Sequence, residues 1–249
     1  MKILSIGNSF SRDAQRYLYG IGRSAGVPVK AMNLVIGGCS LYRHYRNMLS
    51  EGAAYALDLN GMPSDLPLSL KDALLSDEWH FVTLQQYSFE STDYPTYQPY
   101  LNELAAYIRR LCPGARLLLQ QTWAYEPGSA RLAETRYTDP EKMHADLSAA
   151  YRQAAKDIRA DGILPVGDAI AEAYKRGLSP LYRDGFHLSL GLGRFLAGCV
   201  WFSCLTGQDL SAVSYHDFDR ETDPAMVEEA KAIAASVAQN YPIAGVPSR

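Results

Sequence analysis

Five short apolar runs, separated by segments of helical periodicity, constrain the fold of this chain more than any other feature. Each run has the length of a buried strand and is followed by glycine or polar residues; the runs cover residues 3–6, 29–36, 81–84, 116–120 and 163–166. Strands that alternate with helices form a parallel sheet with helices on both faces, joined by right-handed crossovers. We therefore predict an α/β fold around a parallel sheet of about five strands.

The first apolar run ends in Gly7 and delivers Ser9 and Ser11 directly before a helical pattern. In open α/β sheets ligands bind outside the carboxyl ends of the strands, so a serine at this point faces the predicted crevice. It also lies near a helix N-terminus, where free N–H groups and the helix dipole favour developing negative charge. The structural alternative is that Ser9 or Ser11 only caps the helix, and this stretch alone favours capping.

The chain of 249 residues shows no linker, repeat or low-complexity tract, so we expect a single domain over residues 1–249. Residues 52–67 contain the dipeptide Asn60-Gly61, which predicts a hairpin as an excursion from the main sheet. Residues 224–240 are rich in Ala and Glu and predict a C-terminal helix. The apolar stretch 195–205 is too short to span a bilayer and predicts a core helix.

Charge and composition exclude several classes of partner. The formal net charge is −3 and the 24 Lys and Arg residues are spread along the chain, so there is no basic stripe for nucleic acid. The chain begins Met1-Lys2-Ile3 without the pattern of a secretory signal. We expect a cytoplasmic protein as given, or a secreted or periplasmic one if a signal was removed. The sequence does not indicate the oligomeric state.

No pattern for a metal or an organic cofactor is present, and we expect none. The cysteines form no C-x-x-C pair and predict buried free thiols: Cys39, Cys112, Cys199 and Cys204. Four histidines have no acidic or cysteine partner at metal-ligand spacing and are interpreted as surface or structural residues: His44, His80, His144 and His216. The first strand and turn lack the G-x-G-x-x-G spacing of a dinucleotide site.

Polar residues at the predicted strand ends form a set with a common chemistry. Acyl transfer by a serine needs a base, an acid group that orients the base, and donors for the oxyanion. Asp184 and His187 are three residues apart, so the carboxylate can receive Nδ1–H while Nε2 points at Ser9. Gly38 and Gln86 follow the second and third runs and offer N–H donors.

With these residues the sequence resembles the SGNH/GDSL hydrolases, serine esterases and lipases with a flavodoxin-like three-layer α/β/α sandwich. Three blocks carry the resemblance: Ile6-Gly7-Asn8-Ser9-Phe10-Ser11 is similar to the Gly-Asp-Ser-Leu block, Gly37-Gly38-Cys39-Ser40 to the second, and Asp184-Gly185-Phe186-His187 to the final Asp-x-x-His block. The resemblance implies Ser9 as nucleophile and Asp184 and His187 as the rest of the triad. It also implies that the Gly38 N–H joins the oxyanion hole.

The third block departs from that family. Where the family has Gly-x-Asn-Asp, this chain has Leu84-Gln85-Gln86-Tyr87-Ser88. Gln86 offers a side-chain N–H from one methylene further out, and Gln85 is the possible substitute. We therefore expect the N–H groups of Ser9 and Gly38 and the Gln86 amide to form the oxyanion hole. Together with Gln121-Thr122-Trp123-Ala124-Tyr125, the pattern looks most like an SGNH branch known only as a domain of unknown function.

Two functional hypotheses follow. The first is a serine esterase that cleaves small O-acyl esters, such as acetyl groups on carbohydrate, with Trp123 and Tyr125 lining the acyl or leaving-group pocket. The second is a non-catalytic domain on the same scaffold that binds a glycan or another small ligand. Each residue also has a structural interpretation: Gly38 as a turn residue, Gln86 as a partner of backbone groups, and the aromatics as core. The order of the motifs along the chain favours the esterase.

Overall fold

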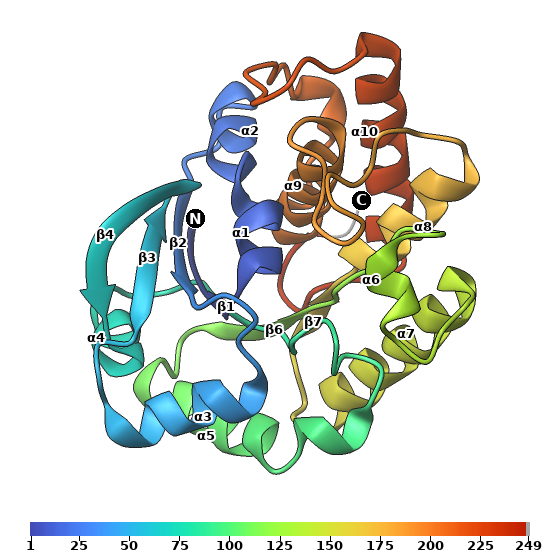
Figure 1. Ribbon diagram of the computed structural model, residues 1–249. Coiled ribbons are helices and arrows are strands. Elements are labelled where there is room, and N and C mark those ends of the chain that lie inside the picture. Colours follow the sequence, from blue (N-terminus) through green and yellow to red (C-terminus); the bar gives the residue numbers. More distant parts are fainter. Residues whose placement is uncertain (248–249) are drawn as a thin grey trace.

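The computed structural model describes residues 1–247, and its centre is a seven-stranded sheet with the order β4-β3-β2-β1-β5-β6-β7 (Figure 1). From β2 to β7 in that order, neighbouring strands run parallel, as predicted, while β3 and β4 pair antiparallel at the β2 edge. The strands are β1 (Lys2–Gly7), β2 (Lys30–Val35), β3 (Tyr55–Leu59), β4 (Met62–Leu68), β5 (Phe81–Leu84), β6 (Arg116–Gln120) and β7 (Gly162–Leu164).

Helices cover both faces of the sheet, which gives the three-layer α/β/α sandwich expected from the sequence. In Figure 1, α1, α2, α9 and α10 lie above the sheet, and α3 and α5 lie below it. The α-helices are α1 (Ser9–Gln15), α2 (Leu18–Ser24), α3 (Leu41–Ser50), α4 (Leu70–Leu75), α5 (Tyr100–Leu111), α6 (Ala130–Ala133), α7 (Pro140–Asp157), α8 (Val166–Lys175), α9 (Leu192–Thr206) and α10 (Pro224–Gln239). Short 3₁₀ helices cover Tyr94–Tyr97 and Leu210–Ala212.

The hairpin around Asn60-Gly61 differs in position from the expectation. Both turn residues have positive φ angles, 52° and 80°, which suit a tight turn between twisted strands. The hairpin does not leave the main sheet, because β3 pairs with β2 and extends it. Asp58 of β3 also accepts two hydrogen bonds from Arg12 of α1, at 2.7 and 2.9 Å, which holds the edge of the sheet to that helix.

The apolar stretch 195–205 forms most of α9, and nearly every side chain of this helix is buried. It packs against α1, α2, α8 and α10, so it is the centre of one helical layer. All four cysteines are buried thiols outside any disulfide, as predicted. None of the helices in residues 1–247 combines the length and the apolar character that a bilayer crossing requires.

Candidate active site

Ser9 is the first residue of α1, at the carboxyl end of the central strand β1. Asn8 caps this helix, because its Oδ1 accepts the Phe10 N–H at 3.0 Å. The Asn8 Nδ2 group donates to the carbonyl of Cys39 at 3.0 Å and so ties the start of α1 to the turn after β2. Ser11 donates to the Asn8 carbonyl at 2.8 Å. The capping role is therefore performed by Asn8, and the Ser9 hydroxyl is free for other contacts.

The Ser9 hydroxyl is hydrogen-bonded to the imidazole predicted from the Asp-x-x-His motif. Ser9 Oγ lies 2.8 Å from His187 Nε2, and Asp184 Oδ2 lies 2.7 Å from Nδ1 of the same ring. Asp184 Oδ1 accepts the His187 backbone N–H at 2.8 Å, which fixes the turn between them. A carboxylate only accepts hydrogen bonds, so it favours the tautomer with the proton on Nδ1. Nε2 is then the acceptor for the Ser9 hydroxyl proton.

The Asp184 carboxyl is 42% exposed, and two opposing effects act on its pKa. Partial burial acts to raise the pKa, but the hydrogen bonds from the His187 ring and backbone N–H outweigh it. The pKa of Asp184 therefore lies below its ordinary value. The carboxylate is ionised at neutral pH, which is the state that orients the imidazole.

Trp123 contacts two of the aromatic residues that pack against His187. Its ring stacks on Phe10 with centroids 4.1 Å apart, and its Nε1–H donates to the Phe186 carbonyl at 2.7 Å. The Phe186 ring lies 3.9 Å from the His187 ring, centroid to centroid. Trp123 is 0% exposed, so in this structure it does not reach a ligand. The core interpretation applies to it, rather than the expected pocket wall.

Tyr125 is also fully buried, and it packs against the segment that carries His187. Its ring packs edge-on against Phe186 at 5.7 Å, and its hydroxyl is 2.9 Å from Ser88 Oγ. The half-buried Arg131 also packs on Phe186, with its guanidinium 4.8 Å from the ring centroid. Arg131 also donates to the hydroxyl of Tyr87 at 3.2 Å. Tyr125 therefore packs in the core and borders a cavity between α7 and α8. Arg131 and Tyr87 are the partly exposed groups next to it.

Gly38 is exposed in the turn after β2. Its φ angle is +59°, a left-handed conformation that favours glycine over residues with a side chain. Among the hydrogen bonds of residues 1–247, none is donated by the Gly38 N–H. The turn adjoins Ser9 through the bond between Asn8 and the Cys39 carbonyl. The N–H of Ser9, in the first turn of α1, likewise has no partner within its own helix.

The third expected donor, the Gln86 amide, is already engaged. Its Nε2 donates to the carbonyl and hydroxyl oxygens of Thr96 at 3.3 and 3.1 Å. Its Oε1 accepts the backbone N–H groups of Leu41 and Tyr87, both at 2.9 Å. The side chain is fully buried, so the structural interpretation holds here. The substitute, Gln85, donates its amide to Asn8 Oδ1 at 2.6 Å.

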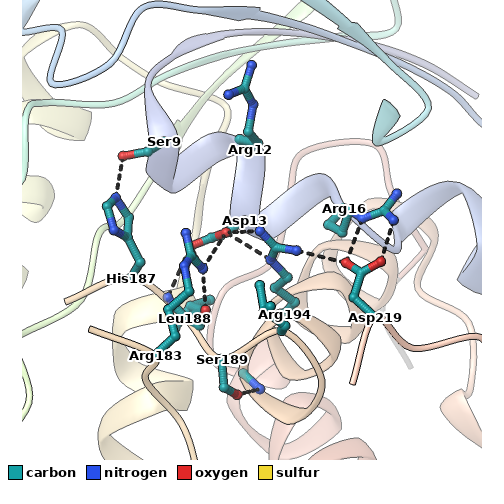
Figure 2. Close-up of polar contacts among 12 residues, drawn as sticks. Ser9, Arg12, Asp13, Arg16, Arg183, His187, Leu188, Ser189, Arg194 and Asp219 are labelled. Atoms are coloured by element: carbon teal, nitrogen blue, oxygen red, sulfur yellow. Dashed lines mark hydrogen bonds and ion pairs between the residues drawn. The ribbon is translucent and has the colours of Figure 1, made fainter. Parts of the chain in front are cut away.

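Sequence reasoning missed an ionic network beside Ser9 and His187, which Figure 2 shows. Asp13 of α1 is buried and accepts hydrogen bonds from Arg183, from Arg194 and from the Leu188 N–H. Asp13 follows Ser9 by four residues, and residues four apart share one face of a helix. This spacing was the available signal, because it predicts that Asp13 and Ser9 face the same segment.

A second histidine–carboxylate pair lies elsewhere, where none was expected. His144 Nε2 is 3.2 Å from Asp168 Oδ1, and Asp168 also accepts from Gln121 at 2.8 Å and from Tyr241. His144 borders a cavity of about 460 Å³ between α7 and α8, and neither Ser9 nor His187 lines it. Within residues 1–247 no group of three or more His, Cys, Asp or Glu side chains has an arrangement that would hold a metal ion.

Comparisons with known proteins agree with this architecture. A solved DUF4886 family protein from Bacteroides uniformis is 33% identical, covering 95% of this chain and 94% of that one, with a TM-score of 0.88. A proposed SGNH hydrolase from Slackia heliotrinireducens is 25% identical, covering 82% and 98%, with a TM-score of 0.61. The acetyl xylan esterase AlAXEase is 16% identical, covering 81% and 98%, with a TM-score of 0.53, which shows a common fold alone. A search of curated proteins found no match.

The family comparison covers both the serine and the histidine of the site. Residues 2–236 match the family described as a domain of unknown function, DUF4886. The solved structures described as an SGNH hydrolase and as an esterase share the layered sheet, which identifies the fold as SGNH-like. The chain therefore belongs to the DUF4886 family.

Proposed function

We propose that this protein is a serine esterase that cleaves small O-acyl esters through an acyl-enzyme on Ser9. The observation that carries the proposal is the hydrogen-bonded series from Ser9 Oγ to His187 Nε2 and from Nδ1 to Asp184, at 2.8 and 2.7 Å. The fold shared with an acetyl xylan esterase supports an ester as substrate. Acetyl groups on carbohydrate are the first substrate class to test.

The reaction has two half-reactions. Ser9 Oγ attacks the acyl carbonyl carbon while its proton passes to His187 Nε2, and Asp184 stabilises the imidazolium that forms. The N–H groups of Ser9 and Gly38 donate to the carbonyl oxygen as it becomes negative. The imidazolium then protonates the departing alcohol. Water, deprotonated by the same imidazole, attacks the acyl-enzyme, releases the carboxylic acid and restores Ser9.

A non-catalytic binding domain is the second candidate, and one observation favours it. The Gln86 amide is bound to Thr96, which leaves two backbone donors in place of three. One oxyanion donor is worth on the order of a hundredfold to a thousandfold in turnover. The number of oxyanion donors therefore does not separate a slow esterase from a non-catalytic binding domain. A covalent reaction at Ser9 separates them.

Turnover of p-nitrophenyl acetate and of acetylated oligosaccharides tests the proposal. The Ser9→Ala variant should lose on the order of a thousandfold or more in kcat, because the nucleophile is gone. Ser24→Ala is the matched control. Ser24 lies in the next helix, α2, and its hydroxyl donates only to the Ile21 carbonyl of that same helix. Equal turnover by the wild type and Ser9→Ala would contradict the esterase. Ligand binding without turnover would favour the binding domain.

A further inference from the structure

A buried carboxylate joins the helix that begins at Ser9 to the segment that carries the histidine. Asp13 is one helical turn after Ser9, on the same face of α1, and its side chain is 1% exposed. Arg183 Nη1 donates to both of its oxygens, at 3.0 and 2.9 Å. Arg194 Nε donates at 2.9 Å and the Leu188 backbone N–H at 3.0 Å. These donors satisfy a charge whose burial is otherwise costly.

The contacts of Asp13 bracket the Asp-x-x-His motif. Arg183 directly precedes Asp184, and Leu188 directly follows His187. The segment is closed on itself, because the Arg183 N–H donates to the His187 carbonyl at 3.0 Å and Arg183 Nη1 donates to the Leu188 carbonyl. Both ends of the segment are therefore fixed to one carboxylate of α1, as Figure 2 shows.

Asp13 also controls where the charge of Arg183 lies. Arg183 Nε is 4.0 Å from Asp184 Oδ2, the oxygen that pairs with His187 Nδ1. The guanidinium forms short hydrogen bonds to the Asp13 carboxylate and only a distant contact to Asp184. When the Asp13 carboxylate is removed, Asp184 is the nearest carboxylate to Arg183. A guanidinium on Oδ2 would compete with the imidazole for the same acceptor.

We propose that Asp13 is a positioning residue for the reaction of Ser9. It holds His187 Nε2 at hydrogen-bonding distance from Ser9 Oγ and keeps Arg183 away from Asp184 Oδ2. It acts through His187 and touches no reacting atom. This inference rests on the proposed esterase function, and its test separates the two.

The same helix supplies a matched control. Arg12, the neighbour of Asp13, donates to Asp58 of β3 at 2.7 and 2.9 Å, and the Asp58 side chain is 3% exposed. The Asp58 carboxylate is thus buried and charge-paired, like that of Asp13. It joins α1 to the edge hairpin, whereas Asp13 joins α1 to the segment of His187.

The first experiment compares Asp13→Asn with Asp58→Asn at a temperature where circular dichroism shows both folded. Misplacement of a catalytic group by about 1 Å costs on the order of a hundredfold, so we expect Asp13→Asn to lower kcat by about that factor. KM should stay within about twofold of wild type, because no substrate contact is removed. Asp58→Asn should keep wild-type kcat. Equal kcat values in the two variants would overturn the inference.

A second pair of variants applies even if Asp13→Asn does not fold. Arg183→Met and Arg194→Met each remove one guanidinium from Asp13, and only Arg183 belongs to the histidine segment. We expect Arg183→Met to lower kcat by about tenfold and Arg194→Met to leave it within about twofold. The reverse order, or equal values, would contradict the positioning role.

A measurement that needs no substrate separates this inference from the proposed function. The low-field proton NMR resonance of His187 Nδ1–H reports its hydrogen bond to Asp184. We expect this resonance in the wild type and in Asp58→Asn, and its loss or upfield shift in Asp13→Asn. An unchanged resonance in Asp13→Asn would overturn the inference, whatever the activity of Ser9. A wild type that shows the resonance and hydrolyses no ester would contradict only the proposed function.

Discussion

Ser9 and His187 are 178 residues apart in the chain, and their side chains meet at 2.8 Å. The arrangement of the elements brings these two side chains together. Ser9 follows the central strand β1 and starts α1, while His187 precedes α9, which packs against α1. The segment that leads into α9 therefore arrives beside the N-terminus of α1.

The pH profile of kcat/KM should show a single protonation on its acid side. An imidazole base works only when neutral, so protonation of the base lowers the rate on the acid side of the profile. The pKa of Asp184 lies below its ordinary value, so this carboxylate stays ionised and adds no second protonation there. We expect kcat/KM for an acetate ester to fall by about tenfold per pH unit on the acid side. A flat profile between about pH 5 and pH 8 would argue against His187 as base.

Acid should destabilise the fold through Asp168. Burial acts to raise the pKa of this carboxyl, but hydrogen bonds from His144, Tyr241 and Gln121 lower it from 3.8 to about 2. Because the unfolded chain takes up the proton first, the stabilisation is complete above about pH 4 and is lost towards about pH 2. We expect Asp168→Asn to lower the free energy of unfolding by about 2 kcal/mol at neutral pH and to flatten this dependence.

Urea unfolding at several pH values measures that effect. Asp217 offers a control, because it lies exposed at the surface and Asp217→Asn should therefore change the free energy of unfolding little. A pH dependence below about pH 4 that is the same in Asp168→Asn and in the wild type would count against this assignment.

Gly38 and Gly37 make a matched pair in the turn after β2. An alanine at position 38 must adopt φ +59°, which costs about 1 kcal/mol, or shift the backbone of the turn that carries the proposed N–H donor. We expect Gly38→Ala to lower kcat by roughly tenfold or more. A Cβ added at Gly37 would meet no heavy atom within 4 Å, so Gly37→Ala should leave kcat and stability near wild type. Similar kcat values for the two variants would exclude the Gly38 N–H as a donor.

Gln86 should matter for stability more than for turnover. Gln86→Ala removes the acceptor of the Leu41 and Tyr87 N–H groups, and each unpaired buried group costs about 1 to 3 kcal/mol. Gln86→Glu keeps an acceptor oxygen for these N–H groups but buries a carboxylate and loses the donor to the Thr96 carbonyl, so it should be destabilised as well. In both variants we expect kcat to fall by less than the roughly hundredfold that a lost oxyanion donor costs. A larger fall in a folded variant would restore the Gln86 amide to the oxyanion hole.

Much of the fold could be predicted because its parallel strands are continuous apolar runs. The dipeptide Asn60-Gly61 predicted the hairpin from turn geometry alone. Its pairing with β2 could not be predicted, since periodicity shows that a strand exists and not which edge it joins.

The candidate site was likewise predictable only in part. Ser9, Asp184 and His187 could be predicted from their order and spacing, and they lie together. The sequence could not show whether a polar group is already satisfied, so the engagement of Gln86 with Thr96 was missed. The burial of Trp123 was missed for a related reason, because an aromatic after a strand fits a core and a pocket equally well.

The most direct test of the central claim is covalent labelling by a fluorophosphonate, followed by mass spectrometry of the digested protein. The probe reacts with a serine only when a neighbouring base activates it. We expect one adduct on the peptide that contains Ser9, much slower labelling in His187→Ala and none at that peptide in Ser9→Ala. An unlabelled wild type, or an adduct confined to another residue, would exclude Ser9 as the nucleophile.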